Sequence, residues 1–328
     1  MKLVKSALAL LLTAAVTYQA QANEPAPATD YPTKAVRVLV GFPPGQTTDV
    51  IARKLAQRLT TNLGQSFYVD NKPGVGAGLA AEEVARANPD GYTILATSSG
   101  PIAVNKWIYK SLRYDSSKDF EPIAFLGLFP LVMFTNTSSK FNTLEDVTTY
   151  AKKNPGKVTY ASGGNGVTNH LVMEMFKKRA DIDLLHIPYR GGVAGMTDVI
   201  GGQVDLMLEV ISIAEPLVKQ GRLKPLAVAS ESRVPTLPNV PTISESGYPG
   251  FRGDPWIGVV APKNIPKEVQ AKLFSEIKKI VDSPEWQQES AALGAMTQLK
   301  GPAEFGEFIK SETARWGEAA KQANVTMN

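Results

Sequence analysis

The sequence lacks cysteine altogether, and only two of its 328 residues are histidine. The missing cysteine excludes a disulfide framework, a thiolate nucleophile, a cysteine-ligated metal and a lipid anchor attached through cysteine. The composition is otherwise ordinary, with 43% hydrophobic and 20% charged residues, which excludes a disordered, collagen-like or coiled-coil protein. At about 150 residues per domain, the length predicts two domains.

A long apolar run is also missing, and the short run at the N-terminus is typical of a secretion signal. Two lysines precede apolar residues 7–16, and residues 20–22 read Ala-Gln-Ala, the small-x-small pattern of a cleavage site. A membrane span would need about 20 apolar residues. We therefore expect residues 1–22 to be a signal peptide, and the mature protein to lie in the periplasm without a lipid anchor.

Neither sign of charge is in clear excess. The chain has 35 basic and 31 acidic residues, and two of the lysines lie in the expected signal peptide, so 33 basic residues and a net charge of +2 remain in the mature chain. The sequence contains no basic run and no RNA- or DNA-binding motif. We expect no nucleic-acid partner.

Strand-like and helix-like segments alternate along the chain in two blocks. The strands are expected at residues 36–40, 66–69, 93–96, 157–161, 184–188, 204–208, 223–228 and 256–260. The helices are expected at residues 48–63, 79–87, 143–154, 167–179, 192–200, 267–281 and 303–323. Such βαβ alternation predicts an α/β fold with mainly parallel sheets.

Two apolar strand-like segments, residues 123–135 and 256–260, join the blocks. The chain would leave the first domain through the former segment and return through the latter. We therefore expect a discontinuous first domain, residues 31–128 and 252–328, with a second domain inserted at residues 129–251. A two-strand connection is a natural hinge because few residues absorb the change in backbone angles.

The segment after the first strand has features of an anion-binding turn. Residues 41–49 read Gly-Phe-Pro-Pro-Gly-Gln-Thr-Thr-Asp. At such a junction the N–H groups of the first helical turn face the crevice where open α/β sheets bind ligands, and the helix dipole favours an anion. Thr47 and Thr48 add hydroxyl donors, and Gly45 lets a ligand approach the backbone. The alternative is that Thr47 or Thr48 only caps the helix.

Two further junctions have the same character. Residues 97–100 read Thr-Ser-Ser-Gly after one strand, and residues 162–168 read Ser-Gly-Gly-Asn-Gly-Val-Thr after another. One such loop is common between a strand and a helix. Three of them, two in the first domain and one in the second, could converge on a cleft between the domains. A set of uncharged donors suits a carboxylate ligand.

Several enzymatic alternatives fail on the residues. Residues 74–78 have the spacing GxGxG instead of GxGxxG, and the next strand has no acidic residue for a ribose, so we expect a turn. There is no Walker A sequence and no GxSxG elbow. His170 and Glu174 have the i, i+4 spacing of a metal pair. With His186 as the only other histidine, we expect a hydrogen bond from that helix instead. We expect no enzyme activity, no cofactor and no metal.

An ordered series of short motifs covers essentially the whole mature chain. Its main members are Tyr31-Pro32, Phe42-Pro43-Pro44-Gly45, Asn71-Lys72-Pro73-Gly74, Asn88-Pro89-Asp90-Gly91, Tyr189-Arg190-Gly191-Gly192, Gly202-Gln203-Val204-Asp205 and Trp256 with Gly258. The series resembles the Bug family, the extracytoplasmic solute receptors of tripartite tricarboxylate transporters. The resemblance implies a Venus-flytrap fold of type II, in which two α/β domains enclose the ligand cleft.

The resemblance also implies the function. Members of the family bind a small carboxylate, such as a di- or tricarboxylate, an acidic amino acid or an aromatic acid. They deliver it to the permease subunits of the transporter, and we expect this chain to act in the same way as a monomer. An alternative function is a ligand-dependent signalling partner that docks on a sensor protein.

By the same resemblance, the ligand carboxylate is held by the loop at residues 42–48, and the second domain contributes residues 162–168. Asp205 matches a family position near the cleft, with a role in bracing a loop as the alternative. Together with the junction at residues 97–100, the expected ligand-binding residues are Phe42, Pro43, Gly45, Gln46, Thr47, Thr48, Ser98, Ser99, Ser162, Gly164, Asn165, Thr168 and Asp205.

Two positions depart from the family pattern. Gln46 stands where a second glycine is usual, and its amide could reach a ligand or narrow the pocket. Asp254-Pro255 stand before Trp256, where small or hydroxyl residues are usual. Trp256 itself could wall an aromatic ligand, but we expect it to be a core residue at the hinge.

Overall fold

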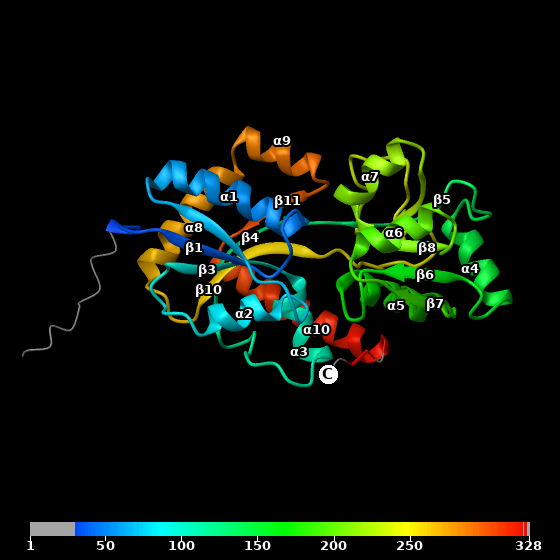
Figure 1. Cartoon of the computed structure of the whole chain (residues 1–328), viewed down its shortest axis with the longest axis horizontal. Coiled ribbons are helices and arrows are strands. Elements are labelled where there is room, and N and C mark those ends of the chain that lie inside the picture. Colours follow the sequence, from blue (N-terminus) through cyan, green and yellow to red (C-terminus); the bar gives the residue numbers. More distant parts are fainter. Residues whose placement is uncertain (1–29, 324, 327–328) are drawn as a thin grey trace, which may run out of the picture.

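A computed structural model describes residues 30–323 and 325–326, and arranges them in two lobes side by side (Figure 1). The expected signal peptide at residues 1–22 lies outside the described residues. Within the described part of the chain, no helix combines the length and the apolar character that crossing a membrane requires.

The first lobe is built on a six-stranded sheet of order β11-β4-β10-β3-β1-β2. Its strands are β1 (Val36–Val40), β2 (Phe67–Asn71), β3 (Thr93–Ser98), β4 (Phe120–Leu128), β10 (Trp256–Pro262) and β11 (Met296–Lys300). Its helical elements are α1 (Thr47–Leu63), α2 (Gly78–Ala85), the π-helical turn η2 (Gly100–Val104), α3 (Asn105–Ile108), α8 (Lys267–Val281), α9 (Pro284–Ala292) and α10 (Pro302–Ala323). The central strand β1 is almost entirely apolar because α1 and α8 cover one face of the sheet, while α2 and α10 cover the other.

The second lobe is built on a five-stranded sheet of order β7-β6-β8-β5-β9. Its strands are β5 (Leu131–Asn136), β6 (Thr159–Ser162), β7 (Leu185–Pro188), β8 (Leu206–Val210) and β9 (Leu223–Val228). Its helices are α4 (Leu144–Lys153), α5 (Thr168–Ala180), α6 (Gly192–Ile200) and α7 (Ile211–Lys219). The expected start of α4 is confirmed, because Thr143 and Asp146 form a reciprocal capping box there.

The prediction of mainly parallel sheets is wrong, because both sheets are mixed. Strand β1 is parallel to β2 and β3, and β6 is parallel to β7 and β8. In contrast, β10 is antiparallel to β3 and β4, and β5 is antiparallel to β8 and β9. The reason is the passage between the lobes: β10 returns from the second lobe and β5 enters it, so each runs against its neighbours.

The segments that connect the lobes lie side by side. The apolar segment at residues 123–135 is divided between β4 and β5, with Phe129 and Pro130 between the two strands. The chain returns through residues 229–255. The N–H of Phe129 donates to the carbonyl of Pro255 at 2.8 Å. Within the returning segment, the N–H of Gly253 donates to the carbonyl of Ala229, also at 2.8 Å. The predicted domain limits on either side of this connection stay a prediction.

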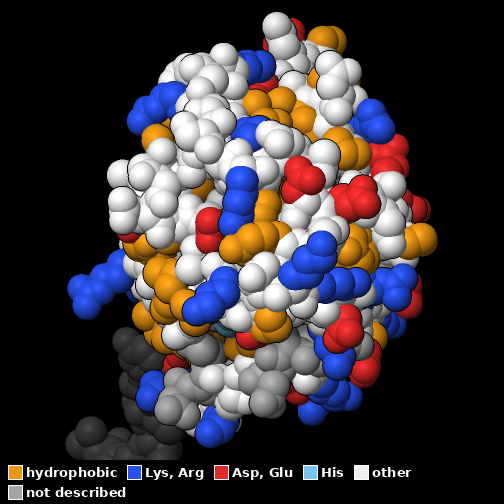
Figure 2. Space-filling view, turned by 90° about the vertical axis from the view of Figure 1, so that its right-hand side faces the viewer, with side chains coloured by type: hydrophobic (Ala, Val, Ile, Leu, Met, Phe, Trp, Pro, Cys, Tyr) orange, Lys and Arg blue, Asp and Glu red, His pale blue; other side chains and the backbone are white. Residues whose placement is uncertain are grey.

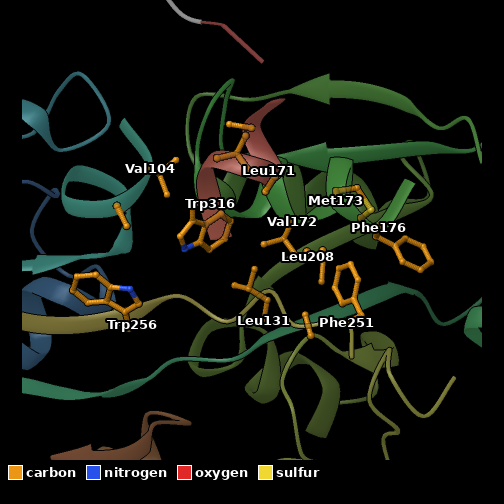
Figure 3. Close-up of a cluster of buried hydrophobic side chains, with 14 of the residues drawn as sticks. Val104, Leu131, Leu171, Val172, Met173, Phe176, Leu208, Phe251, Trp256 and Trp316 are labelled. Carbon is orange, nitrogen blue, oxygen red and sulfur yellow. The ribbon is translucent and has the colours of Figure 1, made fainter. Parts of the chain in front are cut away.

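An apolar cluster beside the connection also joins the lobes. Trp316 on α10 lies close to Leu171 and Val172 on α5 (Figure 3), and these side chains belong to one continuous buried cluster. Trp256, at the start of β10, is fully buried in the same cluster. Its ring meets three phenylalanine rings from β4 and α10, as expected for a core residue at the hinge.

The sequence patterns did not predict several short elements, but they predicted one turn correctly. They did not indicate η2, α3, α7, α9 or β11. Helix α7 contains Pro216, which argues against a helix in any pattern-based prediction. The glycine-rich segment at residues 74–78 is the expected turn, since Gly74, Val75, Gly76 and Ala77 all have positive φ angles.

The strand directions place six loops on facing edges of the two sheets. Strands β1, β2 and β3 are parallel to β4, which ends where the chain leaves for the second lobe. Strands β6, β7 and β8 run against β5, which starts at that same connection. The loops that follow all six strands therefore face the gap between the lobes.

Asp205 connects two strands of the second sheet, and a substitution there tests how much this connection stabilises the protein. One of its carboxylate oxygens accepts hydrogen bonds from the N–H and the hydroxyl of Thr159, at 2.8 and 2.9 Å, which joins β6 to the start of β8. We expect Asp205→Ala to lower the free energy of unfolding by about 2 kcal/mol, because bonds to a charged acceptor are lost. Urea unfolding measures this, and a loss below about 0.5 kcal/mol would contradict the bracing role.

Candidate functional site

The start of α1 is open to an anion. Gln46 is its N-cap residue, in an extended conformation, and makes no side-chain cap hydrogen bond. The alternative that Thr47 or Thr48 caps the helix is therefore wrong, because both residues lie inside it. The first N–H groups of an α-helix have no partner within the helix. Here they face the gap between the lobes at the positive end of the helix dipole.

A buried carboxylate holds the preceding loop in shape. Asp49 is 1% exposed and accepts hydrogen bonds from the N–H of Gly45 at 2.8 Å, from Nδ2 of Asn71 at 2.8 Å and from Nε of Arg53 at 3.0 Å. Burial alone would raise the pKa of Asp49, but the bonds from Arg53, Gly45 and Asn71 outweigh it and hold the pKa below its usual value. Asp49 is thus ionised at neutral pH and ties the loop to β2.

A second polar group lies at the end of β3. Ser98 and Ser99 are buried, and the Ser99 hydroxyl has no hydrogen-bond partner among the described residues. Buried hydroxyls without partners are few in folded proteins and indicate water or a ligand. The chain then enters the π-helical turn η2, a rare element that is frequent at functional sites.

The loop between β6 and α5 uses its own donors internally. The Ser162 hydroxyl donates to the carbonyl of Gly164 at 3.0 Å and lies 2.7 Å from Nε2 of His186. The N–H of Gly164 donates to the Ser162 hydroxyl at 3.2 Å, and that of Gly166 donates to Nδ1 of His170 at 3.1 Å. Ser162 and Gly164, two of the expected ligand-binding residues, therefore shape the loop, while Asn165 is exposed at its tip.

The two histidines are structural. Their rings stack with centroids 4.1 Å apart, and the ring of Tyr160 stacks on His186 at 4.7 Å. Burial lowers the pKa of His170 to about 4, and it lowers the pKa of His186 as well. Glu174 accepts a hydrogen bond from the Tyr160 hydroxyl and pairs with Lys177 at 2.9 Å, so the suspected metal pair is engaged elsewhere. No group of three or more potential metal ligands occurs in the described part of the chain.

Glu209, which the sequence analysis missed, lies at the end of β8. It is 8% exposed, and its carboxylate oxygens accept hydrogen bonds from the N–H of Val210 at 2.8 Å and from Nδ2 of Asn169 at 3.3 Å. Burial raises the pKa of Glu209 to about 7, and the two bonds offset only part of this effect. A single acidic residue within the apolar strand Leu206–Val210 was the available signal.

The lobes touch at the starts of α1 and α7. The hydroxyl oxygen of Thr47 lies 3.3 Å from that of Ser212, so these two side chains form a hydrogen bond across the gap. Gly294, before β11, lies so close to Ile211 that a Cβ atom on the glycine would overlap that side chain. The described conformation is therefore one in which the lobes are in contact at this edge.

The expected site residues fall into two groups. Those at residues 42–48, at residues 98–99 and at residues 162–168 come to the facing edges of the sheets. Asp205 does not, because it lies at the opposite end of β8, where its contacts favour the bracing role. Asp254 is fully buried and pairs with Arg252 at 2.8 Å, so this departure from the family pattern belongs to the returning segment of the hinge.

A hollow of about 610 Å³ elsewhere on the molecule does not compete with this site. It lies between α4 and α5 on the second lobe and is lined by lysines together with acidic residues. Basic and acidic side chains are interspersed over that end of the molecule (Figure 2). The uncapped start of α1 and the buried polar groups lie instead at the facing edges of the two sheets.

Comparisons with known proteins agree with this geometry. The family model described as "Tripartite tricarboxylate transporter family receptor" matches residues 51–325. Protein BugT of Bordetella pertussis is 33% identical over 304 residues, which cover 92% of this chain and 93% of that protein.

Two solved structures extend the similarity to the fold. Rpa4515 of R. palustris, solved with adipate, has a TM-score of 0.84 and 32% identity, and the match covers 90% of this chain and 99% of that one. MatC of Rhodopseudomonas palustris, solved with bound malate, has a TM-score of 0.79 and 28% identity, over 88% and 99% of the two chains. The chain therefore belongs to the Bug family, the solute-binding receptors of tripartite tricarboxylate transporters, and has their two-domain α/β fold.

Proposed function

We propose that this chain is a periplasmic receptor that holds a small carboxylate between its lobes and delivers it to the permease subunits of a tripartite transporter. The observation that carries the proposal is the uncapped start of α1, which faces the gap while Asp49 holds the loop before it. The adipate and malate in the two related structures support the ligand class. In this account the protein binds and releases its ligand without changing it.

The site can hold a carboxylate without a lysine or arginine side chain. The N–H groups of the first turn of α1 and the hydroxyl of Thr48 donate to one carboxylate group, and the helix dipole adds to the attraction. The Ser99 hydroxyl, buried without a partner, is a further donor toward the ligand or a bridging water. Gln46 is exposed in the same loop, where its amide could reach the ligand or narrow the site.

The two lobes close on the ligand by a hinge movement. Residues 31–128 and 252–328 move as one body and residues 129–251 as the other, about the connection at Phe129 and Pro255. A ligand that touches both lobes stabilises the closed state through its higher affinity for that state. We expect micromolar affinity, about −8 kcal/mol.

A screen of carboxylates tests the proposal. Purified mature protein is heated with di-, tri- and aromatic carboxylates and with acidic amino acids, and the melting temperature is recorded. At a ligand concentration 100-fold above Kd, binding stabilises the folded state by about 2.7 kcal/mol, a shift of several degrees. If no compound of these classes raises the melting temperature, the proposed function is wrong.

Thr48→Val removes a hydroxyl from the first turn of α1 while keeping the shape of the side chain. We expect about tenfold weaker binding of the carboxylate found in the screen, because a hydrogen bond to a charged group is lost. Isothermal titration calorimetry measures the affinity. The control is Thr61→Val on the same helix, whose exposed hydroxyl donates only to the carbonyl of Gln57. Equal affinities of the two variants would remove Thr48 from the site.

Gly294→Ala tests closure. Gly294 has φ +68°, and a methyl group there would press on Ile211 of the other lobe. Gly64 has φ +70° with nothing within 4 Å of such a methyl group, so Gly64→Ala carries the same backbone strain without the contact. We expect Gly294→Ala alone to weaken ligand binding, about fivefold for each ~1 kcal/mol added to closure. Unchanged affinity in calorimetry would show that the ligand-bound state does not contain this contact between Gly294 and Ile211.

A further inference from the structure

Glu209 lies near the end of β8, at the edge of the second sheet that faces the first lobe. It is followed at once by the start of α7, where Ser212 contacts Thr47 of α1 across the gap. Its carboxyl group lies between the starts of two helices. Asn169 at the start of α5 donates to it, and a Cβ atom on Gly192, at the start of α6, would overlap its Oε2. Because Gly192 has no side chain, there is room beside it for the carboxyl group of Glu209.

The loop before α5 uses several of its own donors internally. The N–H groups of Gly164 and Gly166 are bonded within their loop. The N–H of Gly163 points to Oδ1 of Asn169 at 3.5 Å, so the amide of Asn169 is held with its Nδ2 toward Glu209. Helices α5 and α6 start without a side-chain cap, as α1 does, so both lobes offer open N–H groups to a ligand, and the second lobe adds an acid, Glu209, between two such helix starts.

The charged and titratable groups of the neighbouring elements are engaged with other partners. On α5, His170 accepts from Gly166, and Glu174 pairs with Lys177. On the α6 side, the Tyr189 hydroxyl donates to Asp198 at 2.6 Å, and Arg190 is exposed in the loop.

The charged groups of the remaining neighbours are paired as well. On α7, Glu215 pairs with Lys219, and on α1 across the gap Asp49 pairs with Arg53. His186 on β7 lies against Ser162. None of these pairs joins a cation to Glu209, which leaves burial as the main influence on its charge.

We propose that Glu209 is a specificity-determining residue that receives the second carboxylate of a dicarboxylate ligand in its protonated form, so that binding takes up one proton. The inference rests on the proposed function, since it assumes that α1 holds the first carboxylate. A hydrogen bond from a carboxylic acid to a carboxylate replaces the repulsion that two buried anions would have. Because the pKa of Glu209 is about 7, the protonated form is available near neutral pH and is depleted as the pH rises.

Calorimetry with malate and with adipate tests the inference. Between pH 6 and pH 8 both carboxyl groups of either ligand are largely ionised, so their own titration contributes little. We expect the wild-type protein to bind about tenfold more weakly at pH 8 than at pH 6. Titrations in buffers with different ionisation enthalpies should show uptake of about one proton per ligand at pH 8.

Glu209→Gln keeps a donor of the same shape but cannot ionise. We expect its affinity to match that of the wild type at pH 6 and to stay constant up to pH 8. The control is Glu276→Gln, which neutralises another buried glutamate, on α8 of the first lobe, where it pairs with Lys279. This control should keep the pH dependence of the wild type.

The outcomes separate the two proposals. Dicarboxylate binding without proton uptake, or a loss of dicarboxylate binding in Glu209→Gln at every pH, overturns the inference and leaves the receptor function standing. Tight binding of an amino acid that is lost in Glu209→Gln also overturns it, because Glu209 would then be an anion paired with an ammonium group. Failure of both dicarboxylates, with a hit elsewhere in the carboxylate screen, overturns the inference alone. Failure of the whole screen overturns both.

Discussion

The two lobes are joined where Phe129 pairs with Pro255, and this connection sets the directions of the strands on either side of it. Because β4 ends and β5 begins there, every strand parallel to β4, and every strand parallel to β8, must end at the gap between the lobes. Helix starts and loop donors from both sheets are thereby collected on facing edges. The buried contact between α10 and α5 holds the two lobes together beside this connection, which leaves the opposite edge free to open and close.

The two lobes differ in how they meet an anion. In the first lobe, Asp49 uses its charge to shape the loop, and the N–H groups of α1 stay open for a ligand. In the second lobe, the loop after β6 satisfies its own N–H groups, and Glu209 stands beside it. Both lobes therefore present uncapped helix starts to an anion, and the second lobe adds a carboxyl group whose affinity for an anion depends on its proton. This asymmetry allows a single ligand to be gripped at two chemically different ends.

Much of the fold could be predicted from the sequence because its elements have strong periodicity and clear punctuation. The bounds of β1, α6, β9 and α8 agree with the predicted ranges, and Thr143 marks the start of α4. The antiparallel strands could not be predicted, since their direction follows from the passage between lobes and leaves no trace in local pattern. In the candidate site, the sequence predicted the loop at residues 41–49 as a strand–helix junction. Glu209 was not, because burial and the proximity of Gly192 exist only in three dimensions.

Hydrogen exchange with and without malate or adipate shows whether one carboxylate ligand bridges the two lobes. We expect slower amide exchange on ligand addition in two segments together, the first turn of α1 at residues 47–50 and the start of α7 at residues 211–214. Protection confined to one lobe, or protection at the hollow between α4 and α5 instead, would contradict it.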